Sequence, residues 1–224
     1  MICEKKIFPN SNPVVAVFDL DGTLTKKDTY IPFLLRVFKS RPGRLFHVSG
    51  LPFFLALFYM RLINNHRLKQ IFLYVFLKGA EIEDILNVAS EFVRALLKDG
   101  MNPVGLKLLH LHQKRGDRII LLTASFDIYV SIIAKHLGIT EILCTRAEIF
   151  EDRYTGNYSG LNCHGFEKLR RIKLYLGNIK KKVFAYSDDI SDLPLLQWAG
   201  KGFFVTPNKR SIRDGRCGFF QIIK

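Results

Sequence analysis

The stretch VFDLDGTLT, residues 17–25, decides how the fold of this chain is interpreted. It starts at the end of an apolar, β-branched run, PVVAVF (residues 13–18), which is typical of a parallel strand buried on both faces. Two carboxylates, Asp19 and Asp21, follow that run directly. Ligands of an open parallel sheet bind beyond the carboxyl ends of its strands, so this placement predicts that both aspartates belong to a binding or catalytic site.

Four further apolar runs predict more strands of the same kind, and segments with a helical pattern lie between them. These runs are RIILLT (118–123), EILCT (141–145), KVFAY (182–186) and GFFVT (202–206). Strands that alternate with helices join into a sheet through right-handed crossovers. The sequence therefore predicts an α/β fold with a Rossmann-like parallel sheet.

Capping and turn residues set the expected ends of the elements between the strands. Asn102-Pro103 predicts the start of a helix that ends at Gly116, and Ser125 is expected to cap a helix that stops near Gly138. The other predicted elements are helices over residues 165–177 and 191–200 and a hairpin that turns at Thr155-Gly156-Asn157.

One long insertion separates the first strand from the rest of the sheet. Residues 26–98 have a helical pattern, are rich in phenylalanine and carry a strong excess of basic side chains. We therefore expect residues 1–25 and 99–224 to form the core domain, and residues 26–98 to form a helical cap inserted after the first strand.

Charge and cysteine content restrict the partners and the compartment. Lys and Arg number 34 against 20 Asp and Glu, so the net charge of +14 predicts an anionic partner such as a phosphate ester, nucleic acid or an anionic membrane surface. The N-terminal residues show no secretory signal, and a cytoplasmic location is expected, peripheral on the inner face of a membrane if the cap binds lipid. The cysteines show no C-x-x-C spacing, which argues against a zinc site and favours a reducing compartment; they are Cys3, Cys144, Cys163 and Cys217.

The polar residues after the predicted strands form a set suited to phosphoryl transfer. One aspartate can attack phosphorus, while another protonates the leaving oxygen and then activates water. A hydroxyl and a lysine can hold phosphate oxygens, and carboxylates from two strands can converge on a hard cation such as Mg²⁺. The residues in these positions are Asp19, Asp21, Thr123, Lys168, Asp188, Asp189 and Asp192.

The run from Asp19 to Thr23, DLDGT, resembles the first motif of the haloacid dehalogenase (HAD) superfamily. Thr123 fits the second motif of that superfamily, Lys168 the third, and the stretch from Ser187 to Asp192 the fourth, in the same order. The position of the cap and the TG…CHGFEK run from Thr155 to Lys168 resemble subfamily IB, which contains phosphoserine phosphatase.

This resemblance implies a role for each candidate residue. Asp19 would be the nucleophile and Asp21 the acid/base, with Thr123 and Lys168 holding the phosphate. The implied Mg²⁺ ligands are Asp19, the backbone carbonyl of Asp21 and Asp188. Asp189 and Asp192 would support that shell, whereas the adjacent Cys163-His164 pair has no further partners and is expected to be structural.

The cap carries most of the excess charge. Residues 26–80 contain ten Lys or Arg and one acid, Asp28, which gives +9 of the net +14. Between Arg44 and Arg61 lie sixteen residues, LFHVSGLPFFLALFYM, fewer than the roughly 20 that a membrane span needs. They form either a buried cap helix or an interfacial segment on anionic lipid. We expect residues 45–60 to contact a membrane or a lipid tail, because no polar face can be drawn in their second half.

The cap also separates the possible substrates. In phosphoserine phosphatases an acidic residue shortly after the first motif binds the substrate amine, and Asp28 stands at a similar offset. Those enzymes bind the substrate carboxylate with a cap arginine, but the matching stretch here, IFLYVFLKG (71–79), has none. The apolar, basic cap resembles instead the subfamily IB lipid phosphatases, such as phosphatidylglycerophosphatase C.

Three functions follow from these observations. The preferred one is a Mg²⁺-dependent phosphatase that acts through an aspartyl-phosphate on a lipid phosphate such as phosphatidylglycerophosphate. A phosphatase for a small soluble phosphomonoester, such as phosphoserine, is the alternative. A basic nucleic-acid-binding module or an inactive pseudo-phosphatase is the third, and the intact acidic set argues against both. No feature points to an obligate protein partner.

Overall fold

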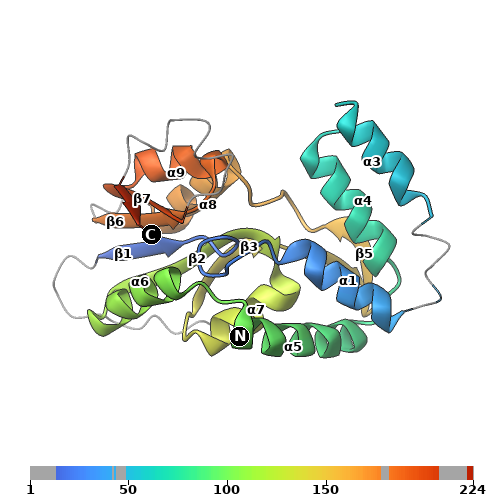
Figure 1. The fold of residues 1–224 in the computed structure, drawn as a ribbon, viewed down its shortest axis with the longest axis horizontal. Helices are drawn as coiled ribbons and strands as arrows, with labels where there is room; N and C mark the ends of the chain where they lie inside the picture. Colours follow the sequence, from blue (N-terminus) through green and yellow to red (C-terminus); the bar gives the residue numbers. More distant parts are fainter. Residues whose placement is uncertain (1–13, 42, 44–48, 178–181, 207–220, 224) are drawn as a thin grey trace.

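The parallel sheet is the centre of the computed structural model, which describes residues 14–41, 43, 49–177, 182–206 and 221–223. Within these residues six strands pair in parallel in the order β3-β2-β1-β6-β7-β8 (Figure 1). The strands are β1 (Val15–Phe18), β2 (Arg118–Phe126), β3 (Glu141–Thr145), β6 (Val183–Ser187), β7 (Lys201–Val205) and β8 (Gln221–Ile223).

The predicted α/β fold is confirmed, and the five predicted strands are all present. β3 has the expected bounds, whereas β2 continues three residues further, to Phe126. The side chains of β1 are fully buried because β1 lies between β2 and β6, with helices on both faces. The sequence did not predict the edge strand β8, and Pro13 of the first run lies outside the described residues.

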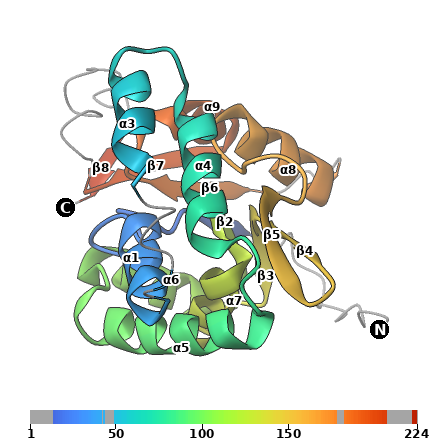
Figure 2. The same cartoon turned by 90° about the vertical axis from the view of Figure 1, so that its right-hand side faces the viewer.

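Helices cover both faces of the sheet and give the core three layers (Figures 1 and 2). One hydrophobic cluster joins the sheet to α5, α6 and α7, and a second joins the other face to α8 and α9. The helices are α5 (Ile82–Asp99), α6 (Pro103–Lys114), α7 (Asp127–His136), α8 (Phe166–Leu176) and α9 (Leu193–Trp198).

The inserted segment forms α1 (Tyr30–Ser40), α3 (Leu51–Tyr59) and α4 (Asn65–Leu77), followed by α5. α5 packs against both α1 and the core helix α7, so it joins the insertion to the core. The antiparallel α3–α4 pair projects from the rest of the molecule in Figure 1. None of the described helices combines the length and the apolar character that crossing a bilayer requires.

A hairpin is present as β4 (Ala147–Phe150) and β5 (Arg153–Tyr158), and it packs against α4 (Figure 2). Its turn is at Glu151-Asp152, however, and the predicted turn residues Thr155-Gly156-Asn157 lie within β5. Gly156 allows this approach, because its φ is +84° and a Cβ there would lie 2.6 Å from Tyr74 Cα. A strand pair that belongs to the core sequence thus supports one side of the cap.

Two helix predictions need correction. Ser125 does not cap α7, because β2 runs through Ser125 and its hydroxyl donates to Asp21 Oδ2 instead (2.5 Å). The helix expected over residues 191–200 is divided into a 3₁₀ turn, η2 (Ile190–Asp192), and α9, which begins at Leu193. Pro194 in the first turn of α9 has no N–H to donate and suits such a helix start.

Candidate active site

The turn after β1 is held tightly against the end of β6. The backbone N–H of Asp19 donates to the carbonyl of Tyr186 (3.0 Å), which continues the sheet pairing by one residue. Gly22 has a φ of +74°, and a Cβ there would lie 2.2 Å from Asp188 Oδ2. Only glycine at position 22 therefore allows the turn after β1 to approach the Asp188 carboxylate without a clash. The strand ends of β1 and β6 form one acidic site, as the sequence predicted.

A buried chain of ionic contacts joins three of the predicted residues. Lys168 Nζ lies 2.8 Å from Asp19 Oδ1 and donates to Asp192 Oδ2 at 2.6 Å. Ser187 Oγ donates to the same Asp192 oxygen (2.7 Å). Asp192 Oδ1 is buried without a hydrogen-bond partner among the described residues. The lysine of α8 is thereby fixed directly beside the expected nucleophile.

Burial shifts the pKa values of this chain of groups. It raises the pKa of the Asp19 carboxyl well above its usual range, and the charge of Lys168 acts in the opposite direction. Burial alone would lower the pKa of Lys168, but the carboxylates of Asp19 and Asp192 outweigh burial and hold that pKa above its usual range. Lys168 is therefore a fixed positive charge at the centre of an acidic cluster.

The carboxylate of Asp21 is oriented by three donors. Its Oδ1 accepts from the backbone N–H of Thr29 (2.7 Å) and from the Thr29 hydroxyl (2.6 Å), and its Oδ2 accepts from Ser125 Oγ. Tyr129, buried beneath them, donates to Ser125 Oγ at 2.9 Å. Charge-assisted hydrogen bonds of this kind hold a carboxylate in one orientation, as an acid/base must be held.

Thr123 and Ser125 occupy different positions at the end of β2. Thr123 is fully buried, and its Oγ1 accepts a hydrogen bond from the backbone N–H of Ser125 (3.0 Å). Ala124 and Ser125 line the cavity described below. The phosphate-binding role of Thr123 stays a prediction. Ser125, which was expected to cap a helix, instead donates a hydrogen bond to Asp21, the expected acid/base.

The remaining acidic residues lie where β6 ends. Asp188 and Asp192 are buried, and Asp189 accepts a hydrogen bond from the backbone N–H of Ser191 (2.7 Å), which starts η2. All three line the same cavity as Asp19 and Asp21. These five carboxylates line one space together with Asp28, and Lys168 lies among them.

The acidic set fits a hard divalent cation. Asp19 and Asp188 supply carboxylate oxygens from neighbouring strands, and the absence of a side chain at Gly22 keeps the space between the two loops open. Among the described residues no three His, Cys, Asp or Glu side chains gather as they would around a metal. The metal ligands implied by the resemblance, Asp19, Asp188 and the Asp21 backbone carbonyl, stay a prediction.

The cavity at the strand ends measures about 690 Å³ and extends beneath the cap. Its core wall carries the aspartates, Lys168 and His164, whose pKa is lowered by burial. Its cap wall combines an apolar surface with charged side chains. The apolar residues are Tyr30, Ile31, Leu55, Leu68 and Phe72, and the charged ones are Lys26, Lys27, Asp28 and Lys69. The cavity therefore has an acidic end on the core and a partly apolar, mostly basic side on the cap.

Lys69, which the sequence did not single out, reaches into this cavity from α4. Its Nζ donates to the carbonyl of Ala124 (2.6 Å) and lies over the rings of Tyr30 and Phe126, 4.9 and 5.1 Å from their centroids. Burial lowers the pKa of Lys69 to about 8, against the opposing charges of Asp21 and Asp28. Ten Lys or Arg lie in residues 26–80, and only the folded arrangement shows that Lys69 donates to the backbone beside the acidic site.

Asp28, expected near the substrate, does line the cavity. Its Oδ1 also accepts from the backbone N–H groups of Tyr30 (3.0 Å) and Ile31 (3.3 Å) at the start of α1. Burial raises the pKa of this carboxyl, and the neighbouring charge of Asp21 adds to the rise. Asp28 thus has a structural role whether or not a substrate amine approaches it.

Comparisons with known proteins agree with this geometry. Residues 16–197 match the family model described as haloacid dehalogenase-like hydrolase. Protein CicA of Caulobacter vibrioides is 32% identical over 200 residues, which cover 88% of each chain. The phosphoserine phosphatase SerB1 of Mycobacterium tuberculosis is 28% identical over 138 residues, which are 60% of this chain and 45% of that protein.

A solved structure shares the whole architecture. A protein of unknown function from Bordetella pertussis Tohama I superposes with a TM-score of 0.78 at 21% identity, covering 96% of this chain and 99% of that one. At 21% identity this superposition shows that the two proteins share a fold, and its coverage includes the cap as well as the core.

Proposed function

The chain belongs to the haloacid dehalogenase-like hydrolases, and on that premise we propose that it is a Mg²⁺-dependent phosphomonoesterase that acts on a lipid phosphate through an aspartyl-phosphate at Asp19. One observation carries the proposal. A single cavity joins the acidic strand ends to a partly apolar wall formed by cap helices.

In the first half-reaction, a carboxylate oxygen of Asp19 attacks phosphorus, and the bond from phosphorus to the alcohol oxygen breaks. Lys168, 2.8 Å from Asp19, orients the nucleophile and stabilises the negative charge on the phosphoryl oxygens. Asp21 protonates the departing oxygen. Thr29 and Ser125 hold that acid in position through their hydrogen bonds.

In the second half-reaction, the same Asp21 carboxylate takes a proton from water, whose oxygen attacks phosphorus of the aspartyl-phosphate. The bond from phosphorus to Asp19 breaks, inorganic phosphate leaves, and the Asp19 carboxylate is restored. Mg²⁺, when bound, neutralises phosphate charge and orients the phosphate oxygens. Asp19, Asp188 and the Asp21 carbonyl are the groups that would hold it.

The lipid part of the proposal rests on the cap. Leu55, Leu68 and Phe72 give the cavity an apolar side that a glycerol phosphate or an acyl chain can cover, whereas a small polar ester would leave it in contact with water. Lys69 faces the same space and would bind a second anionic group, such as the phosphodiester of phosphatidylglycerophosphate.

A small soluble phosphomonoester is the second candidate, because the relative SerB1 bears the name of a phosphoserine phosphatase. Lys69 would then bind the substrate carboxylate, and Asp28 the amine. The two hydrogen bonds that Asp28 already accepts from α1 favour the first candidate, since they leave less of that carboxylate for an amine.

Phosphate release tests the two candidates together. Wild type, Asp19→Asn and Leu55→Ser/Leu68→Ser are assayed with phosphatidylglycerophosphate, lysophosphatidate, phosphoserine and a sugar phosphate, with Mg²⁺ and with EDTA. We expect turnover of the lipid phosphates that requires Mg²⁺ and Asp19 and falls in the double variant. Hydrolysis of phosphoserine alone would replace the lipid proposal with the second candidate, and Mg²⁺-dependent activity of Asp19→Asn would refute the mechanism.

A further inference from the structure

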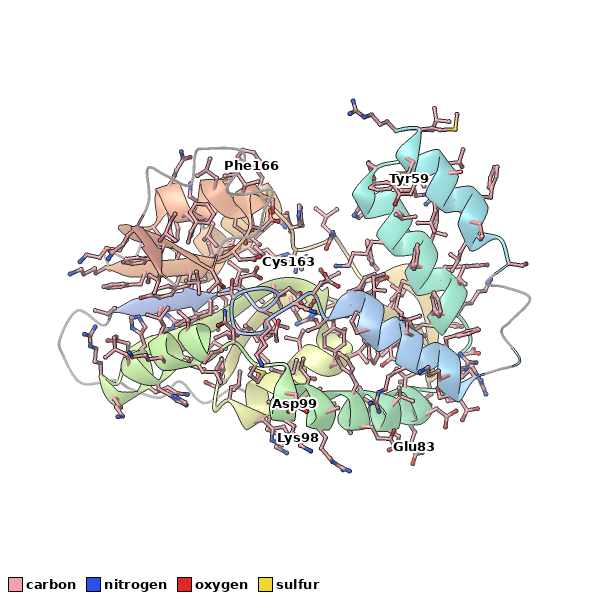
Figure 3. All side chains as sticks on the ribbon, viewed as in Figure 1. Tyr59, Glu83, Lys98, Asp99, Cys163 and Phe166 are labelled. Carbon is pink, nitrogen blue, oxygen red and sulfur yellow. The ribbon has the colours of Figure 1, made fainter. Side chains whose placement is uncertain are left out.

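The α3–α4 hairpin presents an apolar face that the fold does not cover. The side chains of Phe53, Ala56, Tyr59 and Met60 recur along one side of α3 and are exposed, and Leu62 continues this side beyond the helix. The exposed fractions are 64% for Phe53, 81% for Tyr59, 67% for Met60 and 65% for Leu62. We call these five residues the docking face; Figure 3 shows Tyr59 on the projecting hairpin.

The opposite side of α3 already has its neighbours. Phe54, Leu57 and Phe58 are half-buried, Leu55 lines the active-site cavity, and α3 packs chiefly against α4. An ordinary surface helix exposes polar side chains where it does not pack. α3 contains no polar or charged residue except the hydroxyl of Tyr59, so its outer side meets water with apolar groups. A contiguous exposed apolar patch of this kind marks an interaction surface.

The charge around the docking face selects its partner. No Asp or Glu occurs between Asp28 and Glu81 in the sequence. Arg61 lies between Met60 and Leu62 in the sequence, and Arg67 lies in the first turn of α4. Both are exposed, and among the described residues neither forms an ion pair. Apolar side chains flanked by cations, without acids, match the boundary between anionic headgroups and acyl chains.

We propose that the docking face inserts into the surface of an anionic lipid bilayer and holds the cavity mouth against that surface. α3, which carries most of the docking face, also supplies Leu55 to the cavity wall, and its neighbour α4 supplies Leu68 and Phe72. A lipid could thus move from the bilayer along the inner side of the hairpin toward Asp19. This role rests on the proposed lipid phosphatase, but the binding itself does not depend on catalysis.

Flotation with vesicles tests the docking directly. The full chain is mixed with vesicles of phosphatidylcholine and phosphatidylglycerol, or of phosphatidylcholine alone, at low and high salt. We expect flotation with the anionic vesicles at low salt, which decreases at high salt because the charge attraction is screened. Arg61→Gln and Arg67→Gln should each weaken partitioning about fivefold.

A matched pair of double variants locates the contact. Phe53→Glu/Met60→Glu places two acids on the docking face and should stop flotation. Phe150→Glu/Leu174→Glu places two acids at equally exposed apolar positions on β4 and α8, at 66% and 70% exposure, and should float as wild type does. Phe54 and Phe58 are poor positions for this test because their side chains are half-buried and their loss would disturb the hairpin itself.

Each outcome decides for or against docking. Failure of the wild type to float with anionic vesicles at low salt overturns the proposal, as does normal flotation of Phe53→Glu/Met60→Glu. A dimer in light scattering that Phe53→Glu/Met60→Glu abolishes, without flotation of the wild type, assigns this face to a second copy of the chain. Hydrolysis of a lipid phosphate in detergent micelles without flotation would leave the proposed activity intact and refute only the docking.

Discussion

The strand-end site and the α3–α4 hairpin border the same cavity, but they differ in how far their side chains already have partners within the protein. At the strand ends charged groups are fixed by partners within the protein: Lys168 lies between Asp19 and Asp192, and Asp21 accepts hydrogen bonds from Thr29 and Ser125. On the hairpin, apolar side chains face water and Arg61 and Arg67 lack a facing acid among the described residues.

This difference separates two tasks. Chemistry requires that the reacting groups be held in place before the substrate arrives, and buried strands supply that rigidity. Selection of a partner requires side chains that have no partner within the protein, because a surface whose groups are already paired gains little binding free energy from a new contact. We therefore propose that the core determines the reaction and that the cap determines which molecule undergoes it. The following predictions test that division, from the largest expected effect to the smallest.

Substitution Asp19→Asn should have the largest effect. The amide has a similar shape but is a poor nucleophile, so turnover should fall by roughly 10⁴-fold or more. Phosphate release from a soluble phosphomonoester measures the loss, and the melting temperature controls for folding. Retention of a tenth of the wild-type rate would move the nucleophile to another residue.

Substitution Gly22→Ala should disturb the metal site without removing a ligand. The new Cβ would lie within 2.2 Å of Asp188 Oδ2, so either the loop or the carboxylate must shift. We expect the Mg²⁺ concentration for half-maximal activity to rise at least tenfold, as measured by titration of activity with Mg²⁺. Gly116→Ala is the matched control, because its φ of +70° carries similar strain with no atom near its Cβ. An equal response of both variants would mean that strain alone is responsible.

Removal of the Ser125 hydroxyl tests whether orientation of Asp21 matters. A hydrogen bond to a charged group is worth about 1.5–3 kcal/mol, so Ser125→Ala should lower kcat by roughly 10- to 100-fold. KM should change little, because Ser125 positions the acid/base instead of binding the substrate. An effect confined to KM would place Ser125 in substrate binding. Ser131→Ala, which removes an exposed hydroxyl on α7, should leave kcat unchanged.

Lys69 gives a pH test on the cap side. With a pKa of about 8, Lys69 loses its charge as the pH rises through 8, and kcat/KM for substrates with a second anionic group should fall about tenfold over that range. Lys69→Arg should abolish this decline because arginine stays charged, and Lys69→Met should show the low value at every pH. A decline that persists in Lys69→Arg would assign the titration to another group.

The same shift predicts an effect on stability. The folded pKa is about 8 and the ordinary value is 10.5, so the unfolded chain binds more protons between these values. The free energy of unfolding of wild type relative to Lys69→Met should therefore rise as the pH increases from about 8 to about 10.5. Urea unfolding at several pH values measures this, and a relative stability that falls over that interval would contradict the buried, low-pKa lysine.

The smallest expected effect belongs to the docking face. Phe53→Glu/Met60→Glu should leave kcat/KM for a soluble phosphomonoester within about twofold of wild type, because surface substitutions change stability by roughly 0.5 kcal/mol or less. A large loss with the soluble substrate would mean that the hairpin takes part in the chemistry, and the division between core and cap would fail.

Local sequence was sufficient for the core because neighbouring residues carry its signals. The strand β3 was predicted with its observed bounds, and the paired aspartates of DLDGT located the site at the end of β1. β8 was not predicted, because a strand of three residues is too short to show a recognisable hydrophobic pattern. The prediction that Ser125 caps a helix was wrong. A serine before a helix suggests a cap, and only the folded structure shows that the Ser125 hydroxyl lies beside Asp21.

The sequence by itself determined the α/β fold, the acidic site and the apolar, basic character of the cap, since these depend on composition and on spacing along one strand or helix. Tertiary structure alone decided that Lys69, 48 positions after Asp21, enters the cavity while Arg61 and Arg67 stay outside. It also decided which side of α3 packs and which side faces water. α3 is apolar all round, so its sequence contains no stripe from which its orientation could be read, and only its contact with α4 sets that orientation.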